Sequence, residues 1–302
     1  MTLREQIRRN YLMTTVLLVF FGALIGGVGA ALYAAYGTGA AIAVAVIGVI
    51  WAVFSWFLSQ SVVSAATGAR PVTKQEQPDL IIHTGDITHL SKPEEFDAAE
   101  GMFSRLRTTE MHTTPGEHDT TDATVTEYFN RFGKPSNNKG YYSFDHSGVH
   151  FVSLINVLHA GDGGAGSLGD EQLAWIKADL KNRSSSTPIV VFAHMPLWTV
   201  YQPWGWGTTD ADQLLPYLRR FGSVTVLNGH IHQIVQKVEG NITFHTARST
   251  AYPQPAPGEG PGPGPLKVPA DQLAAALGVT SVAVRTHPRS LALSDATLAR
   301  EA

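Results

Sequence analysis

The sequence of 302 residues contains no cysteine, and its first quarter is nearly free of charge. Without cysteine there is no disulfide scaffold, CxxC zinc site, iron–sulfur cluster or thiol nucleophile, so carboxylates and imidazoles are left as metal ligands. Residues 1–78 hold five of the 22 Lys and Arg, two of the 25 Asp and Glu, and none of the 12 His. Residues 79–302 are therefore acidic, which argues against a basic surface for nucleic acid.

No charged residue and no histidine occurs between Arg9 and Arg70. Two apolar stretches in this run, about 11–35 and 40–58, are each long enough to cross about 30 Å of hydrocarbon. A cleaved signal peptide has one shorter apolar core, so the pattern predicts a retained transmembrane hairpin in residues 1–66.

Basic residues flank this hairpin on both outer sides, and residues 67–78 are predicted to form a linker. The flanking basic residues are Arg4, Arg8, Arg9, Arg70 and Lys74. Because such residues stay on the cytoplasmic side, we expect both termini in the cytoplasm and the chain in a bacterial inner membrane.

The N-terminal segment resembles that of the HtpX-type membrane zinc metalloproteases in its hairpin, its flanking arginines and its Ala69-Arg70-Pro71-Val72 linker. Proteolysis in that family requires an HExxH helix. No HExxH occurs in this sequence, and Glu117-His118 lacks the second histidine. The resemblance therefore implies a membrane anchor and no protease activity.

Beyond the linker, the sequence alternates between short apolar runs and amphipathic segments. Strands are predicted at 79–83, 141–144, 150–156, 189–193, 224–227, 234–238 and 242–246, and helices at 93–106, 169–180 and 210–221. Pro and Gly dominate from Tyr252 to Pro269 and exclude regular structure there. This order predicts a layered α+β domain with its core in residues 79–251 and a C-terminal part in 252–302.

Four short clusters combine glycine or proline with Asp, Glu or His at the ends of predicted strands. They are Gly85-Asp86, Gly116-Glu117-His118-Asp119, Ala193-His194-Met195-Pro196 and Gly229-His230-Ile231-His232. A side chain at such a turn points out from the carboxyl edge of a sheet. Oxygen and nitrogen ligands of this kind suit Mn, Fe or Zn. A lone histidine is more often structural, but the pair His230 and His232 indicates metal binding.

This order of clusters resembles the calcineurin-like metallophosphoesterase superfamily, whose motifs read DxH, GDxx, GNHD or GNHE, a histidine before proline, and GHxH. The resemblance implies a four-layer αββα sandwich that hydrolyses phosphomonoesters or phosphodiesters with a metal-bound hydroxide shared by two ions. It implies that Asp86 bridges the ions, that His194 and His230 bind the second, and that His232 binds the first. It also implies that His118 supports the leaving group and that Asp119 orients His118.

Two departures distinguish this sequence from that pattern. Glu117 stands in place of asparagine, and a carboxylate there can still donate oxygen to a metal. The DxH motif is absent, since no Asp or His precedes Asp79. The first ion would keep only Asp86 and His232, so we expect one bound ion, a sandwich without its first strand and an impaired first site. A non-catalytic fusion or remnant, with an HtpX-like anchor and a degraded phosphoesterase domain, remains the alternative.

Three further residues are candidates for contacts with a phosphate-ester substrate. Arg248 follows a predicted strand and could meet a phosphate, Trp204 lies in an aromatic loop after His194, and His89 lies near Asp86. A purely structural role, in which Trp204 packs within the aromatic loop, explains its presence there equally well. The substrate and the membrane are the expected partners, and the sequence gives no indication of an oligomer.

Overall fold

The computed structural model describes residues 26–31, 33–39, 42, 46, 48, 78–106, 108, 110–121, 125–159, 164–286 and 289–299. The chain divides into two compact units, Met1–Glu76 and Gln77–Ala302. The second unit has a mixed α/β fold built on a central mixed sheet.

In the first unit, the described positions are helical on both sides of Gly37, where φ is 81°. This break lies inside the turn predicted between the two apolar stretches. Among the described residues, no helix combines the length and the apolar character needed to cross a membrane. Most of the predicted hairpin, and all of the linker but Pro78, lie outside the described residues.

Six strands form the central sheet in the order β3-β4-β5-β6-β8-β7. Their bounds are β3 Tyr142–His146, β4 Val149–Ser153, β5 Ile189–Ala193, β6 Val224–Asn228, β7 Gln236–Glu239 and β8 Ile242–Thr246. The inner strands β4, β5, β6 and β8 are parallel, and the edge strands β3 and β7 are antiparallel to their neighbours. Strands β4, β5 and β6 are fully buried, which explains their continuous apolar runs.

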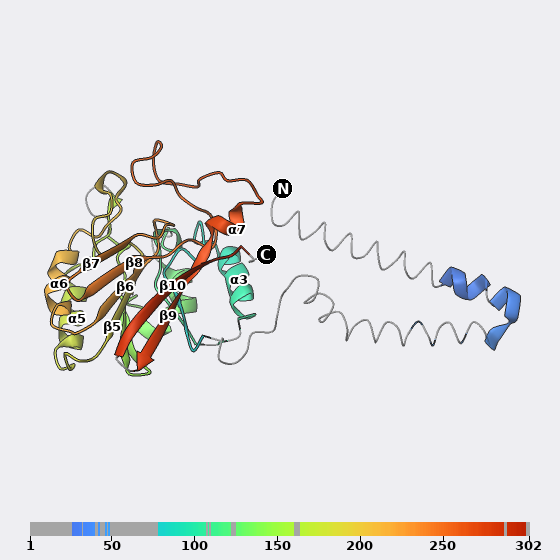
Figure 1. The fold of residues 1–302 in the computed structure, drawn as a ribbon, viewed down its shortest axis with the longest axis horizontal. Coiled ribbons are helices and arrows are strands. Elements are labelled where there is room, and N and C mark those ends of the chain that lie inside the picture. Colours follow the sequence, from blue (N-terminus) through green and yellow to red (C-terminus); the bar gives the residue numbers. More distant parts are fainter. Residues whose placement is uncertain are drawn as a thin grey trace. The chain divides into compact units, whose positions relative to one another are not determined.

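Helices α5 (Asp170–Leu180) and α6 (Ala211–Leu218) cover one face of this sheet. Figure 1 shows them on the side of the sheet opposite the β9–β10 hairpin. Their apolar side chains, such as Ile176 and Leu214, pack on Val191 and Val226 in the larger hydrophobic core. Burial of this apolar stripe is the main force that holds the helices to the sheet.

Two small sheets pack on the other face. Strands β1 (Ile81–His83) and β2 (Met111–Thr113) pair in parallel, and β9 (Gly278–Thr286) and β10 (Arg289–Thr297) form an antiparallel hairpin. Side chains from β1, β9 and β10 contact the same apolar cluster on the central sheet. Within the described residues, β1 has β2 as its single strand partner.

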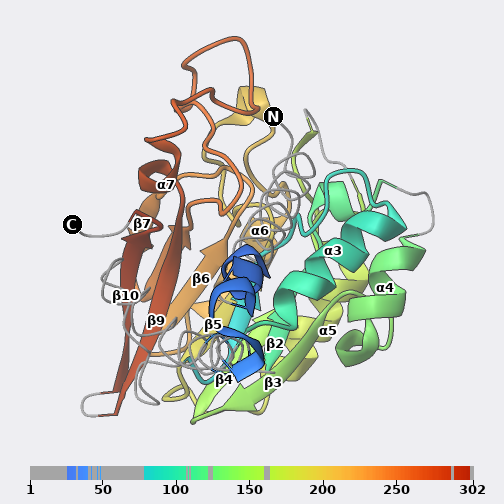
Figure 2. The same ribbon diagram turned by 90° about the vertical axis from the view of Figure 1, so that its right-hand side faces the viewer.

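Helices α3 (Pro93–Phe103) and α4 (Thr126–Phe132) lie beside the β1–β2 sheet, and Figure 2 shows them across the domain from the β9–β10 hairpin. Helix α3 begins with a proline, which is favoured at the first position of a helix. Two glutamates follow, and their negative charges are favourable at the positive end of the helix dipole. Two acidic residues of this helix, Asp97 and Glu100, both form ion pairs with Arg131 of α4.

The remaining elements are a short helix α7 (Leu273–Ala276) and three 3₁₀ turns, η2 (Glu117–Asp119), η3 (Lys134–Ser136) and η5 (Gln202–Trp204). Of the predicted strands, 189–193 and 242–246 agree with β5 and β8 residue for residue. The sequence patterns did not identify β2, β9, β10 or α4. The Pro- and Gly-rich segment 252–269 forms turns and bends, as predicted.

Candidate metal centre

Loops that follow strands β1, β2, β5 and β6 carry the predicted ligands. Asp86 follows β1, Glu117 lies in η2 after β2, His194 directly follows β5, and His230 follows β6. Strands β5 and β6 are parallel neighbours, and so are β1 and β2. Because parallel strands end at a common edge, side chains distant in sequence meet there.

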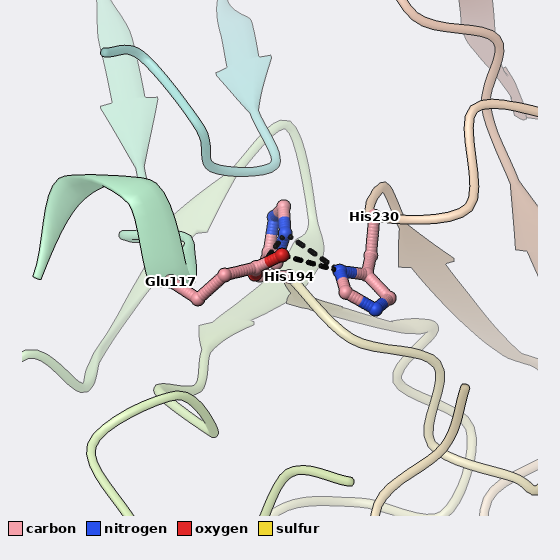
Figure 3. Close-up of side chains that lie close together, drawn as sticks. All are labelled: Glu117, His194 and His230. Carbon is pink, nitrogen blue, oxygen red and sulfur yellow. Dashed lines mark hydrogen bonds and ion pairs between the residues drawn. The ribbon is translucent and has the colours of Figure 1, made fainter. Parts of the chain in front are cut away.

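Ligand atoms of Asp86, Glu117, His194 and His230 lie near one another at this edge, and Figure 3 shows three of these side chains. His194 Nε2 lies 2.8 Å from Glu117 Oε2 and 3.3 Å from Asp86 Oδ2. His230 Nδ1 lies 2.9 Å from Glu117 Oε1 and 3.3 Å from His194 Nε2. Ligand atoms held about 2.1 Å from one cation are separated from each other by roughly 3.0 to 3.4 Å. The distances among Glu117, His194 and His230 are thus close to the spacing of a metal's ligand shell, and Asp86 adjoins this group through His194.

Glu117 Oε2 shows that this set of donors fits a cation. It is buried and accepts no well-formed hydrogen bond among the described residues, its recorded contact being the ion pair of 2.8 Å with His194 Nε2. A buried carboxylate oxygen without a partner is costly. A divalent cation would satisfy it together with the two imidazole nitrogens.

Backbone carbonyls fix the tautomers of three histidines in the site. His194 Nδ1 lies 2.6 Å from Thr84 O, His118 Nδ1 lies 2.9 Å from His89 O, and His232 Nδ1 lies 2.7 Å from the carbonyl oxygen of Tyr252. A carbonyl only accepts hydrogen bonds, so each Nδ1 must carry a proton and donate it. Each Nε2 is then left to accept a proton or to bind a metal, which is the usual arrangement of ligating histidines.

Three predicted ligands have backbone angles that are rare for residues with a side chain. The φ angles are 56° at Asp86, 63° at His230 and 55° at His232. Non-glycine residues in this region carry a conformational cost and cluster at functional sites. Hydrogen bonds near these residues, such as those donated by the His118 N–H to Asp86 Oδ1 and by Gln254 to the His230 carbonyl, help to hold them in that conformation.

Gly116 permits the close approach of two of these loops. A Cβ atom on Gly116 would collide with the carboxylate and the backbone nitrogen of Asp86. Only glycine therefore lets η2 pack directly against the Asp86 turn, with Asp86 Oδ1 accepting a hydrogen bond of 3.1 Å from the backbone N–H of His118.

Asp119 joins two loops of the site through its buried carboxylate. It is fully buried and accepts hydrogen bonds from the backbone of Gly116, Ile87 and Thr88 and from the Thr88 hydroxyl. None of these contacts involves the ring of His118, which donates to the His89 carbonyl instead. The Asp119 carboxylate holds the Asp86 loop onto η2, and its predicted role in orienting His118 stays a prediction.

The carboxylates and His194 strongly perturb one another. Burial lowers the pKa of His194, but the charges of Asp86 and Glu117 outweigh that effect and hold its pKa well above the usual value. Burial raises the pKa of both carboxyl groups, yet His194 overcomes it, and the pKa values of Asp86 and Glu117 are lowered. Without a metal, a proton on His194 supplies the positive charge of the cluster.

His118 and His89 lie together at the side of this cluster. Ligand atoms of His118, Asp86 and Glu117 come within 4.8 Å of one another. The rings of His118 and His89 are stacked, with their centres 5.0 Å apart. His83, in contrast, is buried in β1 against Phe103, and burial lowers its pKa to about 4, as expected of a structural histidine.

His232 is not a member of the close ligand groups among the described residues. It lies in the same loop as His230, and its ring packs on that of Tyr252 at 4.5 Å. The binding of a first ion by Asp86 and His232 therefore stays a prediction.

A cavity of about 320 Å³ opens beside the cluster and is lined by Glu117, His118, His230 and Trp204, among others. Arg248 is not among the described lining residues. Its guanidinium donates to the carbonyls of Ala275 and Ala276 and so caps the C-terminal end of α7. The expected contact of Arg248 with a phosphate stays a prediction that these carbonyl contacts do not support.

Residues that the sequence patterns missed also shape the site. Thr84 and Tyr252 orient histidines through their carbonyl oxygens, and Gln254 donates a hydrogen bond of 3.0 Å to the carbonyl of His230. A backbone carbonyl is common to every residue type, so no motif could have identified these partners.

The sequence profile of the calcineurin-like phosphoesterases matches residues 58–234. The chain belongs to this family of phosphate-ester hydrolases, whose members use divalent metal ions. The match begins within the segment assigned above to the second apolar stretch.

Three curated proteins are similar to the chain. It is 28% identical over 205 residues to the glycerophosphodiester phosphodiesterase GpdQ of Enterobacter lignolyticus (strain SCF1), covering 63% of this chain and 67% of that protein. It is 30% identical over 185 residues to a probable cyclic nucleotide phosphodiesterase of Synechococcus sp. (strain WH7803), covering 53% and 61%. Purple acid phosphatase 15 of Arabidopsis thaliana is 34% identical over 119 residues, covering 36% and 21%. The chain thus spans about two thirds of the first relative and less of the other two.

Proposed function

We propose that this chain is a membrane-anchored, metal-dependent phosphoesterase that hydrolyses a phosphomonoester or a phosphodiester. The close grouping of Glu117, His194 and His230, with Asp86 Oδ2 3.3 Å from His194 Nε2, carries this proposal. The similarity to two phosphodiesterases and a phosphatase supports it.

In this proposal, these four residues hold one divalent ion, Mn, Fe or Zn, and a second ion binds weakly because only Asp86 and His232 remain for it. The bound ion neutralises charge on the phosphate oxygens and lowers the pKa of a water molecule. The chain supplies the geometry, since Thr84 and Asp119 fix the ligands before substrate arrives.

His118 is the residue placed to handle the leaving group. It lines the cavity, its Nδ1 is committed to the His89 carbonyl, and its Nε2 is left for substrate. A proton on Nε2 could pass to the departing alcohol oxygen or hydrogen-bond a phosphate oxygen. Asp119 assists indirectly, because it fixes the turn on which His118 stands.

The membrane anchor and the layer order complete the proposal. The uncharged run from 10 to 69 supports a two-span hairpin like that of the HtpX-type proteases, with both chain ends in the cytoplasm. The layers follow the order α5 and α6, the central sheet, the two small sheets, and then α3 and α4. This order supports the four-layer sandwich.

The test begins with the full chain extracted from membranes in detergent, loaded with Mn²⁺ and freed of excess metal. We expect about one Mn²⁺ per chain and metal-dependent hydrolysis of p-nitrophenyl phosphate esters that EDTA abolishes. Metal binding without hydrolysis of any ester would favour the non-catalytic alternative. Recovery of the chain in the soluble fraction would contradict the anchor.

Mn²⁺ affinity should increase with pH around neutrality. The pKa of His194 is raised, so the metal-free protein keeps a proton on His194 that an incoming cation must displace. Raising the pH removes this competition, and release of one proton gives about a tenfold gain in affinity per pH unit. Calorimetric titration in buffers of different ionisation enthalpy would count the protons, and a pH-independent affinity would contradict the assignment of His194.

A further inference from the structure

The cavity beside the metal centre contains no cationic side chain among its described lining residues. Its single carboxylate, Glu117, belongs to the metal cluster, and the remaining lining is neutral, histidine or aromatic. A phosphomonoester carries close to two negative charges at neutral pH, whereas a phosphodiester carries one. Beyond the charge of the bound ion, the lining supplies no Lys or Arg to compensate the additional negative charge of a monoester, so this pocket suits the monoanion better.

An aromatic loop forms one wall of the cavity and is rigidly built. The backbone of Trp206 pairs with those of Val200 and Tyr201, closing a tight turn. The ring of Trp204 packs edge-on against Tyr201 at 5.3 Å and against Trp206 at 5.0 Å. Trp206 is almost fully buried, whereas Trp204 is partly exposed and lines the cavity. The loop thus offers a preorganised apolar surface.

Another part of the cavity wall, formed by Tyr252 and Gln254, is attached to the histidine loop itself. The carbonyl of Tyr252 accepts the hydrogen bond of His232, its ring packs on His232, and Gln254 bonds to the backbone of His230. The Tyr252 hydroxyl makes no hydrogen bond within the described part of the chain, although Tyr252 lines the cavity. It is a neutral donor available to a phosphate or ester oxygen.

We propose that this cavity binds the second, uncharged alcohol group of a phosphodiester, with Trp204 contacting the group and Tyr252 donating a hydrogen bond to the ester. This inference rests on the proposed hydrolase function and specifies its substrate class. Hydrolysis adds water across one P–O bond, releasing an alcohol and leaving a phosphomonoester. A monoester lacks the group that fills the cavity and brings an additional charge.

Three substrates with the same leaving group separate the two effects. Phenyl p-nitrophenyl phosphate and methyl p-nitrophenyl phosphate carry the same charge but differ in the second group, and p-nitrophenyl phosphate carries the additional charge. For the Mn²⁺-loaded full chain we expect kcat/KM to be about tenfold higher for the phenyl than for the methyl diester. We expect the monoester to be the poorest of the three.

Variants identify the residues responsible. Trp204→Ala should reduce the phenyl-over-methyl preference to about threefold or less. Tyr252→Phe should lower kcat/KM for both diesters about five- to tenfold with unchanged Mn²⁺ content. Trp175→Ala is the matched control, because Trp175 packs on Tyr141 away from the cavity and should leave the preference intact.

Measurements of ligand affinity test the inference even if the chain hydrolyses its substrates slowly. Diphenyl phosphate should bind the Mn²⁺-loaded chain at least about five times more tightly than phenyl phosphate, and Trp204→Ala should remove the difference. Equal affinities, or a preference for the monoester, would overturn the inference. Absence of hydrolysis with a preserved binding preference would instead reject only the hydrolase function.

Discussion

His194→Ala is expected to abolish tight metal binding and to reduce phosphoesterase activity by on the order of 10³-fold or more. His194 Nε2 is the atom that approaches both carboxylates and His230. Its removal takes one ligand from the ion and leaves Asp86 and Glu117 facing each other without the intervening positive charge. Elemental analysis after Mn²⁺ loading and kcat/KM for a p-nitrophenyl ester would measure both effects.

His146→Ala is the control for this substitution. His146 lies on β3 near Glu110, outside the groups of potential metal ligands among the described residues. We expect its metal content to match wild type and its kcat/KM to stay within about twofold. If His194→Ala kept one tightly bound Mn²⁺ and most of its activity, the metal centre would have to lie elsewhere.

Asp119→Ala is expected to destabilise the phosphoesterase domain by about 3 to 5 kcal/mol and to abolish tight Mn²⁺ binding as a consequence. The substitution leaves the backbone N–H groups of Gly116, Ile87 and Thr88 without their acceptor. The Asp86 loop would then lose its attachment to η2. Urea unfolding of the metal-free chain, followed by tryptophan fluorescence, would measure the change.

Two further variants, one at position 119 and one control, distinguish a structural role of Asp119 from a role in proton transfer. Asp119→Asn keeps the shape but points an amide toward N–H donors, so we expect reduced stability with an unchanged pH profile of the residual activity. Asp271→Ala removes an exposed aspartate and should change the unfolding free energy by less than about 0.5 kcal/mol. A stable Asp119→Asn with a shifted pH profile would instead indicate direct participation in proton transfer.

The sequence was most informative where apolar runs and glycines coincide. Buried parallel strands such as β5 are continuous apolar segments in the sequence, so their positions were predictable. Strand β2, Met-His-Thr, has no such run and exists through its pairing with β1. Strands β9 and β10 pair along nine positions each, and that pairing was not evident from local pattern.

Arg248 and Asp119 show that a sequence motif does not identify the contacts that a side chain makes in the folded domain. Both lie close in sequence to site residues, and both were assigned contacts with substrate or with a catalytic ring. In the folded domain, Arg248 meets the carbonyls of α7, and Asp119 meets backbone N–H groups about thirty residues earlier in the chain. The side-chain types indicated which contacts were chemically possible, but the partners that each side chain meets depended on loops from other parts of the chain.

The amino-acid sequence alone determined the ligand types and their order, because glycines at the ends of apolar strands mark turns that place Asp, Glu and His at one sheet edge. It also determined that thiol chemistry is excluded. Only the tertiary structure decided which nitrogen of each histidine faces the centre. That choice depends on carbonyls such as Thr84 O, which lies 110 residues before His194. A hydrogen bond to a backbone atom leaves no trace in side-chain identity, so folding alone assigns it.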